Sequence, residues 1–493
     1  MQFNLNKIKI DHIFFLLLLI STFFLVFFTW EHYFFSDDFY YIIGPKLYTL
    51  ITGQSLKIKD LLLNLGPQDH YAPLYYYYLQ FMPSDAKLFH FVTIIFHSIS
   101  ALLVFFISVE LIKNKKIALL AAMLYFYNMS MHSWPIVWNA FNAHIVNATT
   151  GFFALYLSLR FLRSEKNEIF FLLLISFFSG ITIFIYESGF FYILLICFFQ
   201  FISTHNIKKR IKVLVSIFVP VIIYFSFTIH LSGVLHPISK RAEDSSTKFF
   251  YTNSNTDPSS IYARRSNYAQ RNFINYVIRS YDNLINTFNI GTIEQLTREK
   301  ITKYNQKKEL KILLKNNIFI LILITLIINA IFFYLLIKIF INNLRDKTFL
   351  KLFSLYLLML TITSIIFFRK DLSMALAFSG SLLISYLLFS VEKKRKLIKN
   401  IFITSYFLIS FFYIIGGMQY VHVDYQKSVI KKNHNDLIKS INNFEPPADD
   451  SEVKFYYFYK NFKSYEKELK DFTKKNSHDF HSFAKNFVKF KDY

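Results

Sequence analysis

The sequence has little cysteine, glycine or proline. Its 493 residues include a single cysteine, Cys197, with 11 glycines and 10 prolines. One cysteine excludes an intramolecular disulfide, so any segment outside a membrane must fold without one. Scarce glycine and proline suit long uninterrupted helices better than the turns of a β-barrel. The composition therefore predicts a helical protein.

The chain is also poor in acidic residues and in polar residues generally. Asp and Glu number 32 against 55 Lys and Arg, giving a formal charge of +23, and 54% of residues are hydrophobic. The hydrophobic residues occur in blocks, and the mean hydropathy is +0.34. Lipid can accept such blocks, whereas one globular core cannot. In a membrane protein, excess cations favour cytoplasmic loops and anionic lipid or lipid-linked phosphate over a nucleic-acid partner.

The apolar blocks are long enough to cross a bilayer, which takes about 20 residues of helix. The N-terminal block lacks a small-residue cleavage pattern and is interpreted as an uncleaved first span. The pair within 168–204 is weakly separated, so the count is ten or eleven. The predicted spans are 12–30, 89–112, 117–134, 141–161, 168–186, 188–204, 211–231, 314–342, 347–368, 372–391 and 399–418.

Cationic clusters occupy every second connection between these spans, together with Lys7 and Lys9. Lys and Arg concentrate on the cytoplasmic side of membrane proteins. We therefore expect a multi-pass protein of the cell membrane with a cytoplasmic N-terminus and an outer C-terminus. The clusters are Lys113, Lys115 and Lys116; Arg160, Arg163 and Lys166; Lys208, Lys209, Arg210 and Lys212; Arg345 and Lys347; and Lys393, Lys394, Arg395, Lys396 and Lys399.

This topology predicts an all-α integral membrane domain over 1–418 and a small outside segment over 419–493. The domain has two large outside loops, 31–88 and 232–313. The second loop begins polar and has helical, amphipathic spacing from Tyr262 to Leu314.

An acidic pair, Asp37-Asp38, lies in FFSDDFYYI, where the first span meets the outer face. Ionised carboxylates near a bilayer are costly and are usually kept for function. One carboxylate could act as a general base, or both could hold a divalent cation such as Mg or Mn. A solvated start to the loop is the simpler alternative.

Three further motifs place polar side chains in or near outside loops. GPQDHYAPLYYYYLQF contains His70 and Tyr71; MHSWPIVWNAFNAH contains His132 and two tryptophans; IFIYESGFFYILL contains Glu187. Interfacial anchoring explains most of the tyrosines and tryptophans. An acid between apolar halves, such as Glu187, is a functional hypothesis by default.

Two cations, Arg369 and Lys370 in FFRKDLSMALAFSG, lie on the predicted outer side, against the prevailing charge rule. A phosphate group would suit them. The chain has no metal-spaced Cys/His cluster, no phosphate-binding glycine loop and no Gly-x-Ser-x-Gly. An activated donor would therefore be borne by lipid and reached from outside.

The order of these elements resembles the C-type (GT-C) membrane glycosyltransferases, and is similar to the protein O-mannosyltransferase and aminoarabinose transferase families. The resemblance extends over about 12–205 and 367–390. It rests on the acidic pair after span one and on HYAPL, FHFVTIIFHSISALLVF, MHSWPIVWNAFNAH, YESGFF and FFRKDLSMALAFSG. Two departures bear on the donor contacts: Ala72-Pro73 replaces the usual Arg-Pro, and the last element lacks Tyr-Leu-Pro.

The resemblance implies transfer of a sugar from a polyprenyl-phosphate donor to a glycan, lipid or protein acceptor on the outer face. Asp37 would be the general base, and Asp38 would orient it or share a metal. The departing phosphate would need cations. Those implied are Arg369, Lys370, Arg264 and Arg265.

Three other functions stay open from the sequence alone. An O-antigen-type polymerase or ligase would use an arginine-rich outside loop, which 232–313 could be. A transporter or flippase would have many spans, but mid-span charges and broken helices are lacking. A non-catalytic membrane protein that binds a partner through its tail is the third.

Overall fold

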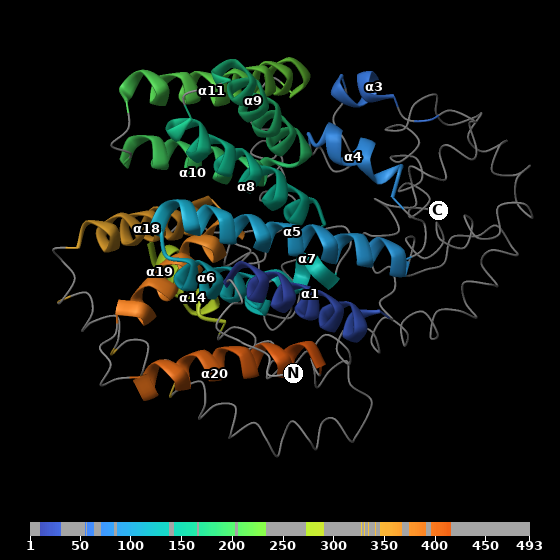
Figure 1. Ribbon diagram of the computed structural model, residues 1–493. Helices are drawn as coiled ribbons and strands as arrows, with labels where there is room; N and C mark the ends of the chain where they lie inside the picture. The colour runs from blue at the N-terminus through green and yellow to red at the C-terminus, as the bar shows by residue number, and fades with distance from the viewer. Residues whose placement is uncertain are drawn as a thin grey trace, which may run out of the picture.

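The computed structural model describes twelve stretches of the chain and four isolated positions between 327 and 341. Within them the regular structure is helical, and no strand occurs in these stretches. Figure 1 shows the long helices stacked side by side. The described stretches are 10–30, 55, 57–63, 71–82, 86–137, 142–164, 167–202, 206–232, 273–289, 346–366, 374–390 and 396–415.

Nine of the predicted spans coincide with a described helix. They are α1 (Ile10–Thr29), α5 (Ala86–Ile112), α8 (Asn142–Arg163), α9 (Glu168–Ile185), α10 (Phe190–Ile202), α11 (Ile207–Ser232), α18 (Lys347–Ile366), α19 (Met374–Ser390) and α20 (Lys396–Phe412).

Six of these helices are long and apolar enough to cross a membrane: α1, α5, α8, α9, α11 and α18. The chain is therefore a multi-pass membrane protein. Most of the predicted span 314–342 lies outside the described residues. The count of ten or eleven, the orientation and the segment 419–493 stay predictions.

The predicted span 117–134 is divided into two helices, α6 (Lys115–Phe126) and α7 (Met129–Val137). The break lies at Asn128, whose side-chain oxygen accepts a hydrogen bond from the Met131 amide at 3.3 Å. An asparagine in this position satisfies an otherwise unpaired donor at a helix start. The same side chain donates to the Thr287 carbonyl at 3.2 Å, so a tertiary contact fixes the break.

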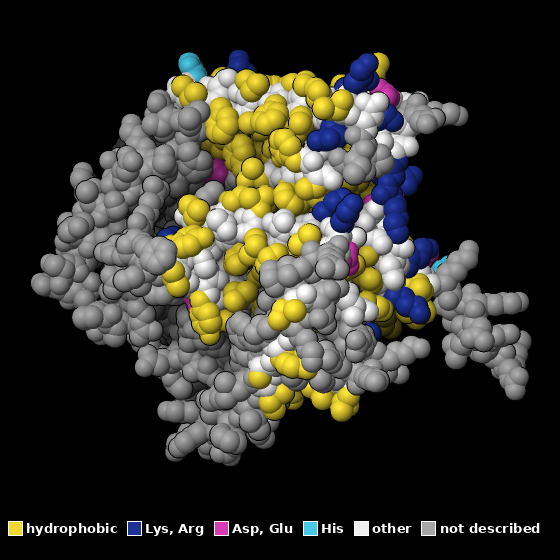
Figure 2. All heavy atoms as spheres, turned by 90° about the vertical axis from the view of Figure 1, so that its left-hand side faces the viewer, with side chains coloured by type: hydrophobic (Ala, Val, Ile, Leu, Met, Phe, Trp, Pro, Cys, Tyr) yellow, Lys and Arg dark blue, Asp and Glu magenta, His cyan; other side chains and the backbone are white. Residues whose placement is uncertain are grey.

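The helices differ in how much apolar surface they leave exposed. Side chains of α19 are almost all buried, whereas α1, α9 and α11 expose large residues such as Phe27, Ile169 and Ile222. In Figure 2, hydrophobic side chains fill much of the described surface, and Lys and Arg gather along one edge of it. This is the arrangement expected of lipid-facing helices that end at a cationic interface.

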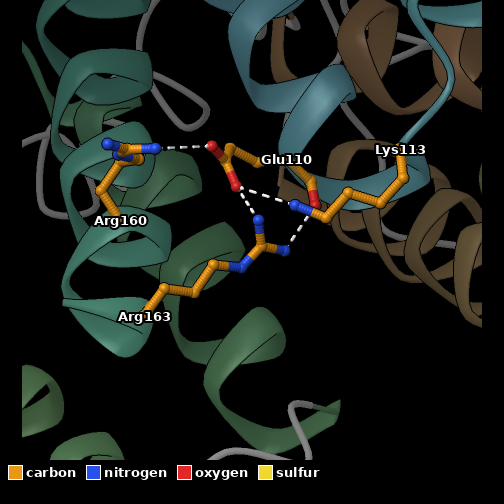
Figure 3. Close-up of polar contacts among 4 residues, drawn as sticks. All are labelled: Glu110, Lys113, Arg160 and Arg163. Carbon is orange, nitrogen blue, oxygen red and sulfur yellow. Dashed lines mark hydrogen bonds and ion pairs between the residues drawn. The ribbon is translucent and has the colours of Figure 1, made fainter.

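At the cationic end of the bundle, α5 and α8 are joined through Glu110 (Figure 3). Its carboxylate pairs with Arg163 and also with Lys113 and Arg160, both at 3.2 Å. Arg163 donates in addition to the Glu110 carbonyl at 2.7 Å, near the end of α5. Glu110 is largely buried while the three cations are more exposed. One carboxylate thus holds two cations of α8 and Lys113, which directly follows α5.

We predict that Glu110→Gln lowers the free energy of unfolding by roughly 1–3 kcal/mol, the range for losing hydrogen bonds to a charged group. The variant leaves three neighbouring cations without their shared carboxylate. Thermal unfolding of the purified protein measures the loss. The control is Glu168→Gln, which removes one half-exposed pair with Lys212 and should cost much less, because solvent screens an exposed ion pair. Equal unfolding temperatures for the two variants would contradict the prediction.

The amphipathic helix predicted in the second loop is present in part as α14 (Phe273–Thr287). Its polar side, including Arg279, Asn283 and Asn286, is buried, whereas Val277 and Tyr281 are exposed. Asn283 donates to Ser364 near the end of α18 at 3.1 Å. One turn further on, at the C-terminal end of α14, Thr287 accepts a hydrogen bond from Tyr356, in the middle of α18, at 3.4 Å. The helix therefore enters between the spans with its polar side inward.

Gly380, in α19, makes room for the end of α14. A Cβ at this position would lie 2.0 Å from Cγ2 of Thr287, and the Thr287 hydroxyl is already held by the Asn283 carbonyl at 2.8 Å. We predict that Gly380→Ala loosens α14, at a cost of about 1–3 kcal/mol for overpacking. Limited trypsin digestion should then cut after the buried Arg279. Gly180→Ala is the control, because its Cβ would meet only the Pro220 Cβ at 3.3 Å; the same digestion pattern in both would refute the prediction.

Candidate functional site

Glu187 lies in a tight connection between α9 and α10. Tyr186 is extended, and Glu187–Gly189 form one turn of 3-10 helix (η5) before α10 begins. A Cβ at Gly189 would lie 2.4 Å from the Thr182 carbonyl oxygen. Only glycine permits this close approach, which brings the chain back over α9. The turn buries Glu187 at the end of the bundle.

Polar side chains of α8 hold this turn in place. Ser188 Oγ is hydrogen-bonded to His144 Nδ1 at 3.0 Å and accepts from Asn147 at 3.0 Å. Asn147 also donates to the Tyr186 carbonyl at 3.0 Å. His144 and Tyr186 pack edge to face. The Tyr186 carbonyl and the Ser188 side chain, on either side of Glu187, are thus held by two residues one helical turn apart on α8.

Tyr71 reaches the same region from the first loop. It precedes α4 (Pro73–Leu79), is fully buried, and donates from its hydroxyl to the carbonyl of Leu62, the last residue of α3 (Ile58–Leu62), at 3.0 Å. Burial raises the pKa of the Tyr71 hydroxyl, which keeps it a proton donor. Its ring packs on Tyr224 of α11 and Phe184 of α9, with centroids 5.4 and 6.0 Å apart.

Tyr224 connects Tyr71 with Glu187. Its ring contacts Tyr71 and also packs on Phe190, which directly follows the turn that holds Glu187, with centroids 5.4 Å apart in both pairs. The structure therefore brings together two predicted residues from loops far apart in sequence. A carboxylate, phenolic hydroxyls, an imidazole and amides can bind a polyhydroxylated ligand, because they supply both donors and acceptors.

His132 belongs to a second buried cluster. Its ring packs against His97 and Tyr125, with centroids 4.8 and 4.6 Å apart. His97 Nε2 is hydrogen-bonded to the Phe126 carbonyl at 3.0 Å. Ser100 and Thr149, 2.8 Å apart, join α5 of this cluster to α8. Both clusters are thus supported by α8, but His132 packs within α5, α6 and α7 rather than beside Glu187.

The other predicted site residues lie outside the described residues, and their roles stay predictions. So does the divalent cation expected at the acidic pair. Within the described stretches, no three His, Cys, Asp or Glu side chains are grouped so that they could hold a metal ion. The residues concerned are Asp37, Asp38, His70, Arg264, Arg265, Arg369 and Lys370.

Sequence reasoning did not single out Asn147, Ser188 and Tyr224. Asn147 could have been noticed as an amide inside a predicted span, where an unpaired polar group is costly. Tyr224 gave no such signal, because tyrosine is common throughout the chain.

Comparison with known proteins gives little further guidance. No family model matches the chain, and no curated protein matches its sequence. Its structure is similar to that of the archaeal oligosaccharyltransferase AglB from Archaeoglobus fulgidus, solved with an inhibitory peptide and a dolichol-phosphate. The match has a TM-score of 0.45 and 14% identity over 85% of this chain and 56% of AglB. The chain thus covers under two thirds of AglB, and a likeness this low defines neither fold nor activity.

Proposed function

We propose that the protein is a membrane glycosyltransferase that moves a sugar from a polyprenyl-phosphate donor to a glycan, lipid or protein acceptor on the outer face. In this proposal Asp37 is the general base, and it removes the proton of the acceptor as the acceptor attacks the anomeric carbon. Asp38 orients Asp37 or shares a divalent cation with it.

One structural observation supports the proposal most directly. Tyr71 and Glu187 come from two separate elements of the ordered set that includes Asp37-Asp38, and both Tyr71 and the turn that holds Glu187 adjoin Tyr224. This meeting point lies beyond the C-terminal end of α9, whereas Glu168 and its partner Lys212 lie at the other end. The 18 residues of α9 separate the two ends by about 27 Å. A site remote from the cationic end is the arrangement that outer-face chemistry requires.

The roles of the predicted cations follow from the negative charge that develops on the leaving group during transfer. A phosphate leaving group departs as an anion and is stabilised by fixed cations. Arg369 and Lys370, with Arg264 and Arg265, are the proposed contacts. Tyr71, His70, His132 and Glu187 are proposed to bind or position the substrates, and the polyprenyl chain would lie against the apolar spans.

The test is transfer by the purified full-length chain, supplied with polyprenyl-phosphate sugars and candidate acceptors. We expect mass spectrometry to detect a co-purified polyprenyl phosphate and a glycosylated product whose formation depends on the lipid-linked donor. If flux in proteoliposomes occurs without any lipid-linked sugar, the transporter alternative is supported instead. If Arg264 and Arg265 are essential and Asp37 is not, the polymerase alternative is supported.

A further inference from the structure

The cationic end of the bundle carries more positive charge than its own carboxylates balance. Around the ends of α5, α8, α9 and α11, seven described cations face two described carboxylates, Glu110 and Glu168, an excess of five. Like charges confined to one end of a protein repel one another and attract an anionic partner. The cations are Lys113, Arg160, Arg163, Lys208, Lys209, Arg210 and Lys212.

The first turns of α11 hold four of these, Lys208, Lys209, Arg210 and Lys212, here called the α11 cations. Only Lys212 pairs with a described carboxylate, Glu168, at 2.5 Å. Lys209 donates to the Ser164 carbonyl after α8, and Arg210 donates to the Phe201 carbonyl near the end of α10 at 3.4 Å. Lys208 is exposed. The carbonyl contacts thus hold Lys209 and Arg210 in place without neutralising them, and the pair with Glu168 balances Lys212 alone.

Exposed apolar residues begin directly beside the α11 cations and continue along two adjacent helices. On α11 they follow at helical spacing, and α9, which packs beside α11, exposes a parallel row. Helix α11 lies at the top of Figure 1, and Figure 2 is turned about the vertical axis, so this part of the molecule is at the top there too. Hydrophobic side chains in that part of Figure 2 adjoin the Lys and Arg edge. The two rows are Ile207, Ile211, Val215 and Ile222 on α11, and Ile169, Phe170, Leu173 and Phe177 on α9.

We propose that this surface binds an acidic phospholipid, with its phosphodiester group held by the α11 cations and its acyl chains lying along the α9 and α11 rows. An acidic phospholipid has a negatively charged head group attached to two hydrocarbon tails. The surface is complementary to it, because fixed cations lie beside two apolar rows. Each Lys or Arg near an anionic membrane surface adds to the attraction. A zwitterionic phospholipid would meet the same apolar rows but offers no net negative charge, so selectivity is expected to depend on the head group.

The experiment is native mass spectrometry of the full-length protein, titrated with phosphatidylglycerol or phosphatidylcholine of identical acyl chains. We expect phosphatidylglycerol to be retained at least fivefold better. Lys208→Gln/Lys209→Gln/Arg210→Gln should abolish that preference, whereas Lys347→Gln/Lys351→Gln, which removes two cations at the start of α18, should keep it. Equal retention of the two lipids by the wild type, or unchanged preference in the α11 variant, would overturn the proposal.

Two further measurements separate a loss of lipid binding from a folding defect and identify which kind of lipid binds. Lys208→Gln alone removes a side chain without a described partner, so it should reduce the preference while the unfolding temperature stays unchanged. A polyprenyl phosphate added as competitor should leave the bound phosphatidylglycerol in place. Displacement at equal concentration would assign the cations to a lipid-linked donor and contradict a phospholipid site. Since this experiment follows lipid retention and not turnover, its outcome is independent of the proposed transferase activity.

Discussion

Replacing Asp37 with asparagine is expected to lower the rate of sugar transfer at least about 100-fold, the lower range for loss of a general base. Asparagine has the size of aspartate but cannot accept a proton at neutral pH. The acceptor would then attack with its proton still attached. The measurement is the initial rate of product formation at saturating polyprenyl-phosphate sugar, normalised to inserted protein.

The matched control is Asp11→Asn, near the start of α1, where Asp11 pairs with Lys115 at 2.5 Å. That change should leave turnover within about twofold, because a half-exposed pair contributes little. Asp38→Asn should also abolish transfer, and partial recovery with added Mn²⁺ would assign Asp38 to the metal. Full activity in both Asp37→Asn and Asp38→Asn would eliminate the transferase proposal.

Glu187→Gln is expected to lower kcat/KM by at least about tenfold, a loss of about 1.4 kcal/mol of transition-state stabilisation. The side chain is buried in a turn that Gly189, Asn147 and Ser188 hold in one position. Glutamine preserves its length and removes only its charge. Transfer assays at varied acceptor and donor concentrations show which substrate the charge serves.

The control for Glu187 is Glu168→Gln, at the other end of α9, whose turnover should match the wild type. Thermal unfolding separates a chemical from a structural role. If Glu187→Gln is destabilised, Glu187→Asp restores the charge with a shorter side chain, and recovered turnover would still support the functional role. Wild-type kcat/KM in a well-folded Glu187→Gln variant would show that Glu187 only shapes the turn.

The positions of the spans followed from the sequence because hydrocarbon imposes a simple requirement on each segment. A run of about 20 apolar residues satisfies it locally, whatever its neighbours are. This reasoning located α1, α5, α8, α9, α11 and α18. It missed the break at Asn128, since an average over the apolar run hides a single asparagine whose partner, the Thr287 carbonyl, lies in a remote loop.

The sequence by itself determined that this is a multi-span helical membrane protein with its cations concentrated between alternate spans, because apolar length and charge are properties of short segments. It also identified Tyr71 and Glu187 as polar residues worth attention. Only the tertiary structure decided that these two meet around Tyr224, that His132 belongs to a different cluster, and that α14 turns its polar side inward. Those arrangements depend on which helix faces pack together, and packing is decided by distant residues acting at once.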